Sequence, residues 1–222
     1  EEGTKVLLQI KREDKYFTYD VTRKQISFPT VVGEMLGNTA YIKISSFGEK
    51  TSSDFRVKYE ELKKHSPANY IVDIRNNGGG YLDTVIHLAG SFIGPQPVVL
   101  TKDRFNGETK ILASGDVDVI DKPVILLVNE YSASASEILS AALKDYDKAF
   151  IIGTNTYGKG TVQTLFQLFD DSVLKLTVQE FFSPYGNKIN KIGIKPHFEV
   201  NGVDPLTVAE LLFGSSGTVK DK

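Results

Sequence analysis

Three alternating serines, Ser132, Ser134 and Ser136, stand directly before an amphipathic stretch that predicts a helix. The apolar run Val124–Val128 precedes them and is typical of a strand buried on both faces. A helix N-terminus presents unpaired backbone N–H groups and the positive end of the helix dipole, so an oxyanion formed there is stabilised. A serine at this point is a candidate nucleophile. Serine is also common as a helix-capping residue, and the serines alone favour capping.

A lysine between two glycines, Gly158-Lys159-Gly160, follows a second apolar strand predicted over residues 149–152. A solvated lysine needs no flanking glycines, whereas a lysine whose backbone must turn sharply to direct its amine does. Neutral lysine is a competent general base where burial disfavours the ammonium form. These residues therefore predict a serine–lysine dyad, and that mechanism requires Lys159 to be shielded from water.

A glycine-rich segment, RNNGGG over residues 75–80, follows an apolar strand predicted over residues 70–74. An amphipathic helix is predicted after it, because Leu82, Val85 and Ile86 begin an apolar stripe. Glycines allow the backbone to approach a substrate closely and leave N–H groups directed outward. The segment is a candidate source of oxyanion-hole donors, and an ordinary strand-to-helix turn remains the alternative.

These blocks together resemble the carboxyl-terminal processing proteases, also called tail-specific proteases, which are serine endopeptidases. The matching blocks are IVDIRNNGGGYL (71–82), VNEYSASASEI (128–138) and GTNTYGKGTVQ (153–163). The resemblance implies that Ser134 is the nucleophile, that Lys159 is the general base and that Gln163 positions the amine. The interval between Ser134 and Lys159 is the one that the family keeps.

The resemblance also implies an oxyanion hole, in which the N–H of Ala135 acts together with that of Gly79 or Gly80. Family members often have proline at the position of Gly78, and the choice of glycine stays open. Asp145 matches a family position whose loss harms activity, and we expect it to have a structural role. Neither a metal nor a cofactor is implied.

The repeated alternation of predicted strands and helices favours an α/β fold of stacked βαβ units. The resemblance implies the spiral architecture shared by crotonases and Clp-type peptidases. By the same resemblance, residues 28–213 form the protease core, and the hairpin predicted within residues 1–27 is the last part of a truncated PDZ domain. We expect residues 214–222 to be a disordered tail.

Further elements are expected within the core. A strand is predicted over residues 40–47, followed by a helix capped by Thr51, Ser52 and Ser53. Two hairpins are predicted, the first turning at Asn106-Gly107 and the second at residues 170–172. A last helix is predicted to be capped by Asp204.

Composition narrows the possible partners and chemistry. The chain has 222 residues, of which 41% are hydrophobic and 24% charged, and its formal charge of −2 includes no basic cluster. Nucleic acid is therefore not an expected partner. The absence of cysteine excludes disulfides and thiol catalysis. No apolar run approaches the roughly 20 residues of a membrane helix, and the first residues lack a signal-peptide layout, so we expect either a soluble chain or one separated from its anchor.

Three alternatives compete with the dyad. Residues 153–161 have the spacing of a phosphate-binding loop, but such a loop requires a helix to begin at its lysine, and a strand is predicted there. His65, His87 and His197 show no metal-ligand spacing, so surface or capping roles are expected. A peptide-binding domain of the same fold that does not cleave is the third alternative, although the serine, lysine and glutamine are all present.

The resulting prediction is a serine endopeptidase that cleaves unfolded or C-terminal tail segments of proteins through an acyl-enzyme intermediate. Its partners would be protein or peptide substrates. By resemblance the protein works outside the cytoplasm, in the cell envelope or secreted. Assembly into a homo-oligomer and membrane association through parts absent from this chain are left open.

Overall fold

A six-stranded, mostly parallel sheet forms the centre of the molecule. The structure is a computed structural model that describes residues 1–25, 28–105, 107–114 and 119–214. The strands, in the spatial order β12-β9-β8-β5-β4-β3, are β12 (Phe198–Glu199), β9 (Phe150–Gly153), β8 (Val124–Val128), β5 (Asn69–Asp73), β4 (Thr39–Ile44) and β3 (Val31–Leu36). All neighbouring pairs are parallel except β3 and β4, which are antiparallel.

Both faces of this sheet are covered, which explains why its central strands are uninterrupted apolar runs. Val72 and Leu126 pack into the larger core with helices α1 (Thr51–Lys63), α2 (Leu82–Ile93) and α3 (Ala135–Asp145). Ile71 and Leu127 face the opposite side and pack in the core that includes α4 (Pro205–Leu212). The alternation of side chains along each strand therefore fills two cores at once.

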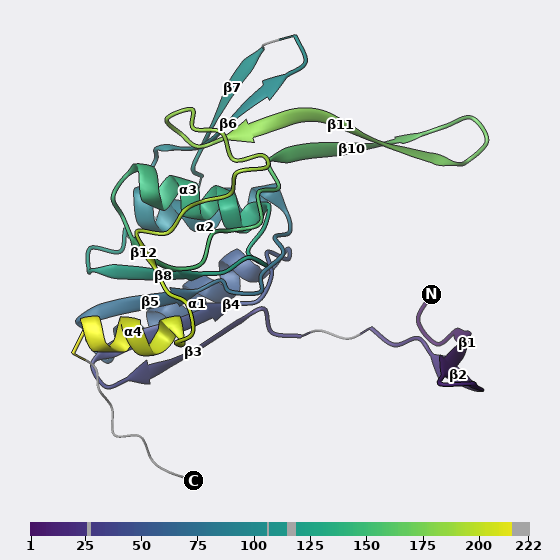
Figure 1. The fold of residues 1–222 in the computed structure, drawn as a ribbon, viewed down its shortest axis with the longest axis horizontal. Coiled ribbons are helices and arrows are strands. Elements are labelled where there is room, and N and C mark those ends of the chain that lie inside the picture. The colour runs from purple at the N-terminus through teal and green to yellow at the C-terminus, as the bar shows by residue number, and fades with distance from the viewer. Residues whose placement is uncertain (26–27, 106, 115–118, 215–222) are drawn as a thin grey trace.

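A second, antiparallel sheet lies beyond α2 and α3, on the far side from the first sheet (Figure 1). Its strands, in the order β10-β11-β6-β7, are β10 (Thr161–Gln167), β11 (Val173–Phe182), β6 (Pro97–Asp103) and β7 (Glu108–Leu112). Figure 1 shows β10 and β11 extending from the body as a long two-stranded ribbon. The fold is mixed α/β, as predicted.

The loops that carry the predicted site leave the same edge of the central sheet. Strands β5, β8 and β9 are parallel neighbours, so their C-terminal ends lie together. Residues 74–81 follow β5, residues 129–134 follow β8 and residues 154–160 follow β9. In open α/β sheets this edge is where ligands bind.

Most of the predicted elements are present, including β8 and α2 at their predicted positions. The prediction that Thr51, Ser52 and Ser53 cap α1 is wrong, because Lys50 is the N-cap and no side chain caps it. The hydroxyl of Thr51 is instead used by the preceding loop, accepting a bond of 2.9 Å from the N–H of Gly48. Strands β3 and β12 were not predicted.

Two predictions fall partly or wholly outside the described residues. The first is the turn between β6 and β7, whose first residue, Asn106, is not described. The other is the tail, of which the structure describes only Gly214. No helix in the described part of the chain is both long and apolar enough to cross a bilayer.

The N-terminal hairpin lies apart from the rest of the molecule (Figure 1). It consists of β1 (Lys5–Arg12) and β2 (Lys15–Thr22), as predicted, and nearly all of its side chains are exposed. The exposed apolar side chains are Leu7, Leu8, Ile10, Tyr16, Phe17, Tyr19 and Val21. An isolated two-stranded hairpin is marginally stable in water, so this surface is suited to packing against further strands.

A charged cluster attaches α4 to the end of β5. Buried Asp73 accepts hydrogen bonds from the Tyr41 hydroxyl (2.8 Å) and from Arg75 Nη2 (2.6 Å). Arg75 also pairs with Asp204, which caps α4 by accepting from the N–H of Leu206 (3.0 Å). Partial burial favours neutral Asp204, but its bonds from Leu206 and Arg75 outweigh burial and lower its pKa.

We predict that Asp204→Asn keeps the cap of α4 but loses the ion pair, lowering the free energy of unfolding by up to about 1 kcal/mol at neutral pH. A carboxylate whose pKa is lowered by folding stabilises the protein above its unfolded-state pKa, and this stabilisation is lost as the pH falls through the folded-state pKa. The difference from wild type should therefore vanish as the pH falls below about 4. Urea denaturation across this pH range measures it.

The matched control is Asp14→Asn, in the exposed turn between β1 and β2. Asp204→Ala, which removes the cap as well, should cost about 1 kcal/mol more than Asp204→Asn. A difference between wild type and Asp204→Asn that persisted in acid would show that the charge of Asp204 does not contribute.

Candidate active site

The three serines before α3 have different surroundings. Ser132 and Ser136 are fully buried. The Ser132 hydroxyl donates to the carbonyl oxygen of Ile74 (2.8 Å), and the Ser136 hydroxyl donates to that of Asn77 (2.8 Å). Both serines therefore attach the start of α3 to the loop after β5. Ser134 is only half-buried and lines a pocket, so it is the serine available to a substrate.

Ser134 is the N-cap of α3 and has an unusual backbone conformation, with φ 58° and ψ −114°. A positive φ is uncommon for residues other than glycine, and such conformations cost about 1–3 kcal/mol. They persist where surrounding contacts fix them, most often at functional sites. Here the N–H of Ser134 donates to the carboxylate of Glu137 (2.9 Å). The hydroxyls of Ser132 and Ser136, two residues away on either side, attach the turn to the loop after β5.

One pocket of about 340 Å³ brings the predicted site residues together. The predicted residues that line it are Ser134, Lys159, Gln163, Ala135 and Gly80. Gln163 lies where the pairing of β10 with β11 shifts at a bulge, a feature that redirects side chains. Apolar side chains from α2, α3 and the second sheet complete the walls, namely Leu82, Ile138, Val162, Leu165 and Phe181.

The glycine loop distinguishes the two candidate oxyanion donors. The N–H of Gly79 donates to Oδ1 of buried Asn77 (2.9 Å), so this group is already engaged. Tyr81 donates its N–H to the carbonyl of Phe47 (2.8 Å), and along an extended chain successive N–H groups point to opposite sides. The N–H of Gly80 is thus directed away from Phe47, and Gly80 lines the pocket.

Glu137 is a site residue that the sequence reasoning missed. Its side chain is fully buried in the first turn of α3. Both carboxylate oxygens accept hydrogen bonds, and the donors are the N–H of Ser134 (2.9 Å), the hydroxyl of Thr156 (2.7 Å), the N–H of Gly158 (2.6 Å) and the N–H of Lys159 (2.8 Å). One carboxylate therefore connects the backbone of the serine turn to that of the lysine loop. The Ser-x-x-Glu spacing of a capping box was the available signal.

The prediction that Lys159 is shielded from water is wrong for this structure, because Lys159 and Gln163 are both exposed. The flanking glycines meet different needs: Gly158 has a φ of +89°, the sharp turn that was expected, whereas Gly160 leaves room for a neighbouring backbone. A Cβ at Gly160 would lie 2.4 Å from the N of Asn190, and a Cβ at Gly158 would lie 3.1 Å from the N of Ile192. The backbone of this loop packs closely against residues 190–193, and the exposed lysine side chain lines the pocket of Ser134.

The phosphate-loop alternative is contradicted by the chain after Lys159, which enters β10 at Thr161. No helix begins there, so the loop lacks the following helix whose N-terminus would face the phosphates. Within the described ranges, no group of three or more histidine, aspartate or glutamate side chains is placed to hold a metal ion.

The three histidines are not brought together with the dyad residues. His65 follows the end of α1, and His197 accepts a hydrogen bond at Nδ1 from the N–H of Ile151 (2.9 Å). Partial burial, with the charge of Lys144, lowers the pKa of His197. His87 is exposed on α2, as expected, and its Nδ1 lies 2.7 Å from the carbonyl oxygen of Asp83.

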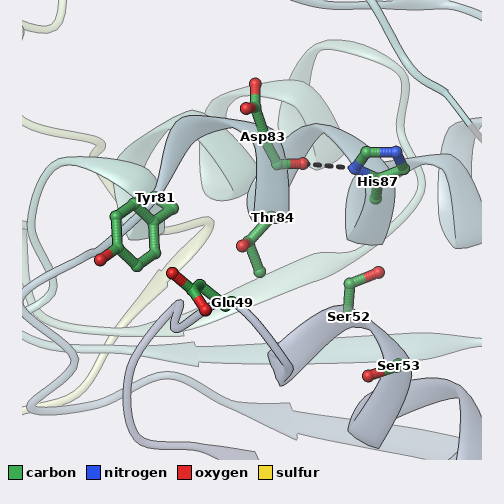
Figure 2. Close-up of a pocket in the computed structure, with 7 residues that line it drawn as sticks. All are labelled: Glu49, Ser52, Ser53, Tyr81, Asp83, Thr84 and His87. Carbon is green, nitrogen blue, oxygen red and sulfur yellow. Dashed lines mark hydrogen bonds between the residues drawn. The ribbon is translucent and has the colours of Figure 1, made fainter.

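A second pocket, of about 450 Å³, lies between the first turns of α1 and α2 (Figure 2). Its lining residues are Glu49, Ser52, Ser53, Tyr81, Asp83, Thr84 and His87. The segment Gly80-Tyr81-Leu82 separates the two pockets, because Gly80 and Leu82 line the first and Tyr81 lines the second.

Asp145, at the end of α3, holds a neighbouring loop. Its carboxylate accepts from the N–H of Tyr185 (2.8 Å) and from Nδ2 of Asn187 (3.3 Å). These contacts agree with the structural role expected for Asp145.

The sequence model of peptidase family S41 matches residues 38–200, which include all of the loops described above. The chain belongs to this family. It is similar to the carboxy-terminal-processing protease of Bartonella bacilliformis, with 35% identity over 205 residues, or 89% of this chain and 47% of that protein. It is also 35% identical over 196 residues to the carboxy-terminal processing protease CtpA of Bacillus subtilis, covering 87% of this chain and 42% of that protein.

Among solved structures, the photosystem II D1 C-terminal processing protease matches 90% of this chain and 56% of its own, with a TM-score of 0.75 and 29% identity. The chain spans less than half the length of the two curated relatives named above. The S41 peptidase domain accounts for the α/β core and the site loops.

We predict that Gly79→Ala displaces the serine turn. A Cβ at Gly79 would lie 2.8 Å from both the carbonyl oxygen of Ala133 and the Cβ of Ser134, and φ is +104°. The expected loss is about 1–3 kcal/mol of unfolding free energy, with loss of any activity that depends on Ser134. The control is Gly78→Ala, where an added Cβ meets nothing within 4 Å. Equal effects at both positions would contradict this account.

We predict that Glu137→Gln destabilises the site, because the amide NH₂ of glutamine would face N–H donors where a carboxylate oxygen now accepts. Leaving such buried groups unsatisfied costs about 1–3 kcal/mol, more where a charged group is involved. Urea denaturation measures the loss. Glu130→Gln is the matched control, since exposed Glu130 accepts one bond, from Thr154 (2.9 Å). An unchanged stability for Glu137→Gln would exclude the linking role.

Proposed function

We propose that this chain carries the proteolytic site of a serine-type carboxyl-terminal processing peptidase, with Ser134 as nucleophile and Lys159 as general base. The observation that carries the proposal is the single pocket lined by Ser134, Lys159 and Gln163. The strained backbone of Ser134 and membership of peptidase family S41 support it.

The proposed reaction begins when neutral Lys159, oriented by Gln163, takes the proton of the Ser134 hydroxyl. The oxygen attacks the scissile carbonyl, and the N–H groups of Gly80 and Ala135 bind the oxyanion, each such donor being worth about 3 kcal/mol. The lysine then protonates the leaving amine and activates a water molecule, which hydrolyses the acyl-enzyme. The N-terminal end of α3 adds its dipole to the oxyanion site.

The proposed substrates are unfolded proteins or C-terminal tails, bound as an extended strand. Within the described residues, β10 is an edge strand of its sheet and begins directly after the lysine loop. An edge strand offers unpaired backbone groups to an added peptide. Most backbone groups inside a folded domain are already paired, which favours unfolded segments.

The wider architecture is part of the same proposal. Residues 28–213 would form a spiral of the crotonase and Clp-peptidase type, and the β1–β2 hairpin would complete a PDZ domain. The exposed apolar side chains of the hairpin support the second statement. Location outside the cytoplasm, membrane association and assembly into a homo-oligomer are carried over from the family resemblance.

We predict that Ser134→Ala and Lys159→Ala each abolish peptide cleavage by the full-length protein, whereas Lys148→Ala, at an exposed lysine outside the pocket, leaves cleavage unchanged. Because an ammonium cannot accept a proton, kcat/KM should rise on the alkaline side. The measurement is mass-spectrometric detection of peptide fragments across a pH series.

Cleavage that survived in either folded variant would remove the dyad. A wild-type protein that bound peptides without cutting them would instead identify a non-cleaving peptide-binding domain.

A further inference from the structure

The charges around the pocket of Ser134 are of one sign. Two ionisable side chains line it, Lys159 and Lys175, and no carboxylate is among its lining residues. Lys159 has a role in the proposed reaction, whereas Lys175 has none. Within the part of the chain that the structure describes, no acidic side chain forms a salt bridge with Lys175.

The register of the β10–β11 ribbon places Lys175 on the pocket side. Lys175 is paired with Leu165, and Thr177 with Gln163, and cross-strand partners share a face of the ribbon. Leu165 and Gln163 both line the pocket. Since a strand rises about 3.4 Å per residue, the Leu165–Lys175 pair lies about 7 Å further along the ribbon than Gln163.

The second pocket has the opposite charge. Its lining includes Glu49 and Asp83, without lysine or arginine. Figure 2 shows both carboxylates in this pocket together with Tyr81, whose chain neighbours Gly80 and Leu82 line the pocket of Ser134. A substrate carboxylate near Ser134 is therefore attracted toward the ribbon and disfavoured near Tyr81.

We propose that Lys175 is a specificity-determining residue that binds a carboxylate of the substrate, about two residues from the scissile bond. An extended peptide advances by the same spacing as the strand beside it, which sets this distance. The carboxylate belongs either to an acidic side chain or to the C-terminus of the substrate. The inference rests on the proposed function, because it assumes that peptides lie along this pocket.

The competing explanation is that Lys175 only keeps an exposed ribbon soluble, as charged residues on sheet edges often do. The ribbon carries much exposed apolar surface, including Leu165, Phe166, Leu174 and Leu176. A solubilising lysine would not alter the relative affinity for acidic and neutral peptides. Peptide selectivity therefore separates the two explanations.

The test uses the full-length protein with Ser134→Ala, so that binding is measured without cleavage. Labelled apolar peptides carry a single Glu or Gln at each position in turn, with either a free or an amidated C-terminus, and fluorescence anisotropy gives their affinities. We expect one Glu peptide, or the free C-terminus, to bind about three- to fivefold more tightly than its neutral partner. High salt should reduce this preference.

Lys175→Ala should abolish the preference and Lys175→Glu should reverse it in favour of a lysine-containing peptide. The matched control is Lys110→Glu, at an exposed lysine on β7 of the same sheet that does not line the pocket. Two results would overturn the inference. One is a preference for carboxylates that persists in Lys175→Glu, and the other is the absence of any such preference in the Ser134→Ala protein that retains Lys175.

Cleavage of the same peptides by protein that retains Ser134 is measured in parallel. Cleavage without charge preference would leave the proposed function intact and remove the role of Lys175. Binding that depends on Lys175, without any cleavage, would support the role of Lys175 and contradict the proposed function.

Discussion

The candidate site depends on one buried carboxylate, that of Glu137. An ionised carboxylate without partners is very costly to bury, so its donors must all be in place for the loops to hold their positions. The donors come from the serine turn at one end and from Thr156, Gly158 and Lys159 at the other. The first turn of α3 contributes its dipole as well. A single charged group thus fixes two segments that lie far apart in the sequence.

A second set of contacts makes the strained serine turn tolerable. Asn77 is fully buried; its carbonyl accepts from the Ser136 hydroxyl, and its side chain donates to the carbonyl of Ile44 (3.0 Å). Gly79 lies so close to Ser134 that no side chain fits between them. The positive φ of Ser134 is therefore imposed by the loop after β5, whose own position is set by the parallel sheet. Glu137 contacts Lys159 through its backbone N–H, and the lysine side chain is exposed.

The central parallel strands and the helices of the core could be predicted from the sequence, because buried parallel strands have uninterrupted apolar runs and β8 shows one clearly. The antiparallel strand β3 was not predicted. The short strand β12 carries no such signal, having only two residues. The sequence alone could not show which of the three serines is available to a substrate. The hydroxyls of Ser132 and Ser136 bond to carbonyl groups in a loop that is remote in sequence.

The lysine loop shows a second limit of sequence reasoning. Both glycines around Lys159 were attributed to a sharp backbone turn, which Gly158 makes with a φ of +89°, whereas Gly160 is required by the packing of its backbone against Asn190. Such a contact could not be foreseen, because only the fold brings residues 190–193 next to the lysine loop. The Ser-x-x-Glu spacing could have identified Glu137 as a capping residue only, since its other partners, Thr156 and Gly158, are remote from it in sequence.

The exposure of Lys159 has a consequence for how a dyad at this site operates. A lysine that must be neutral requires removal of water, and the chain does not provide it by burial. We infer that the substrate supplies the missing wall, since a peptide strand paired with β10 would cover Gln163 and Lys159 together. Formation of an active base would then follow from strand pairing and would not precede it. A polypeptide that cannot present an extended strand would leave this wall incomplete.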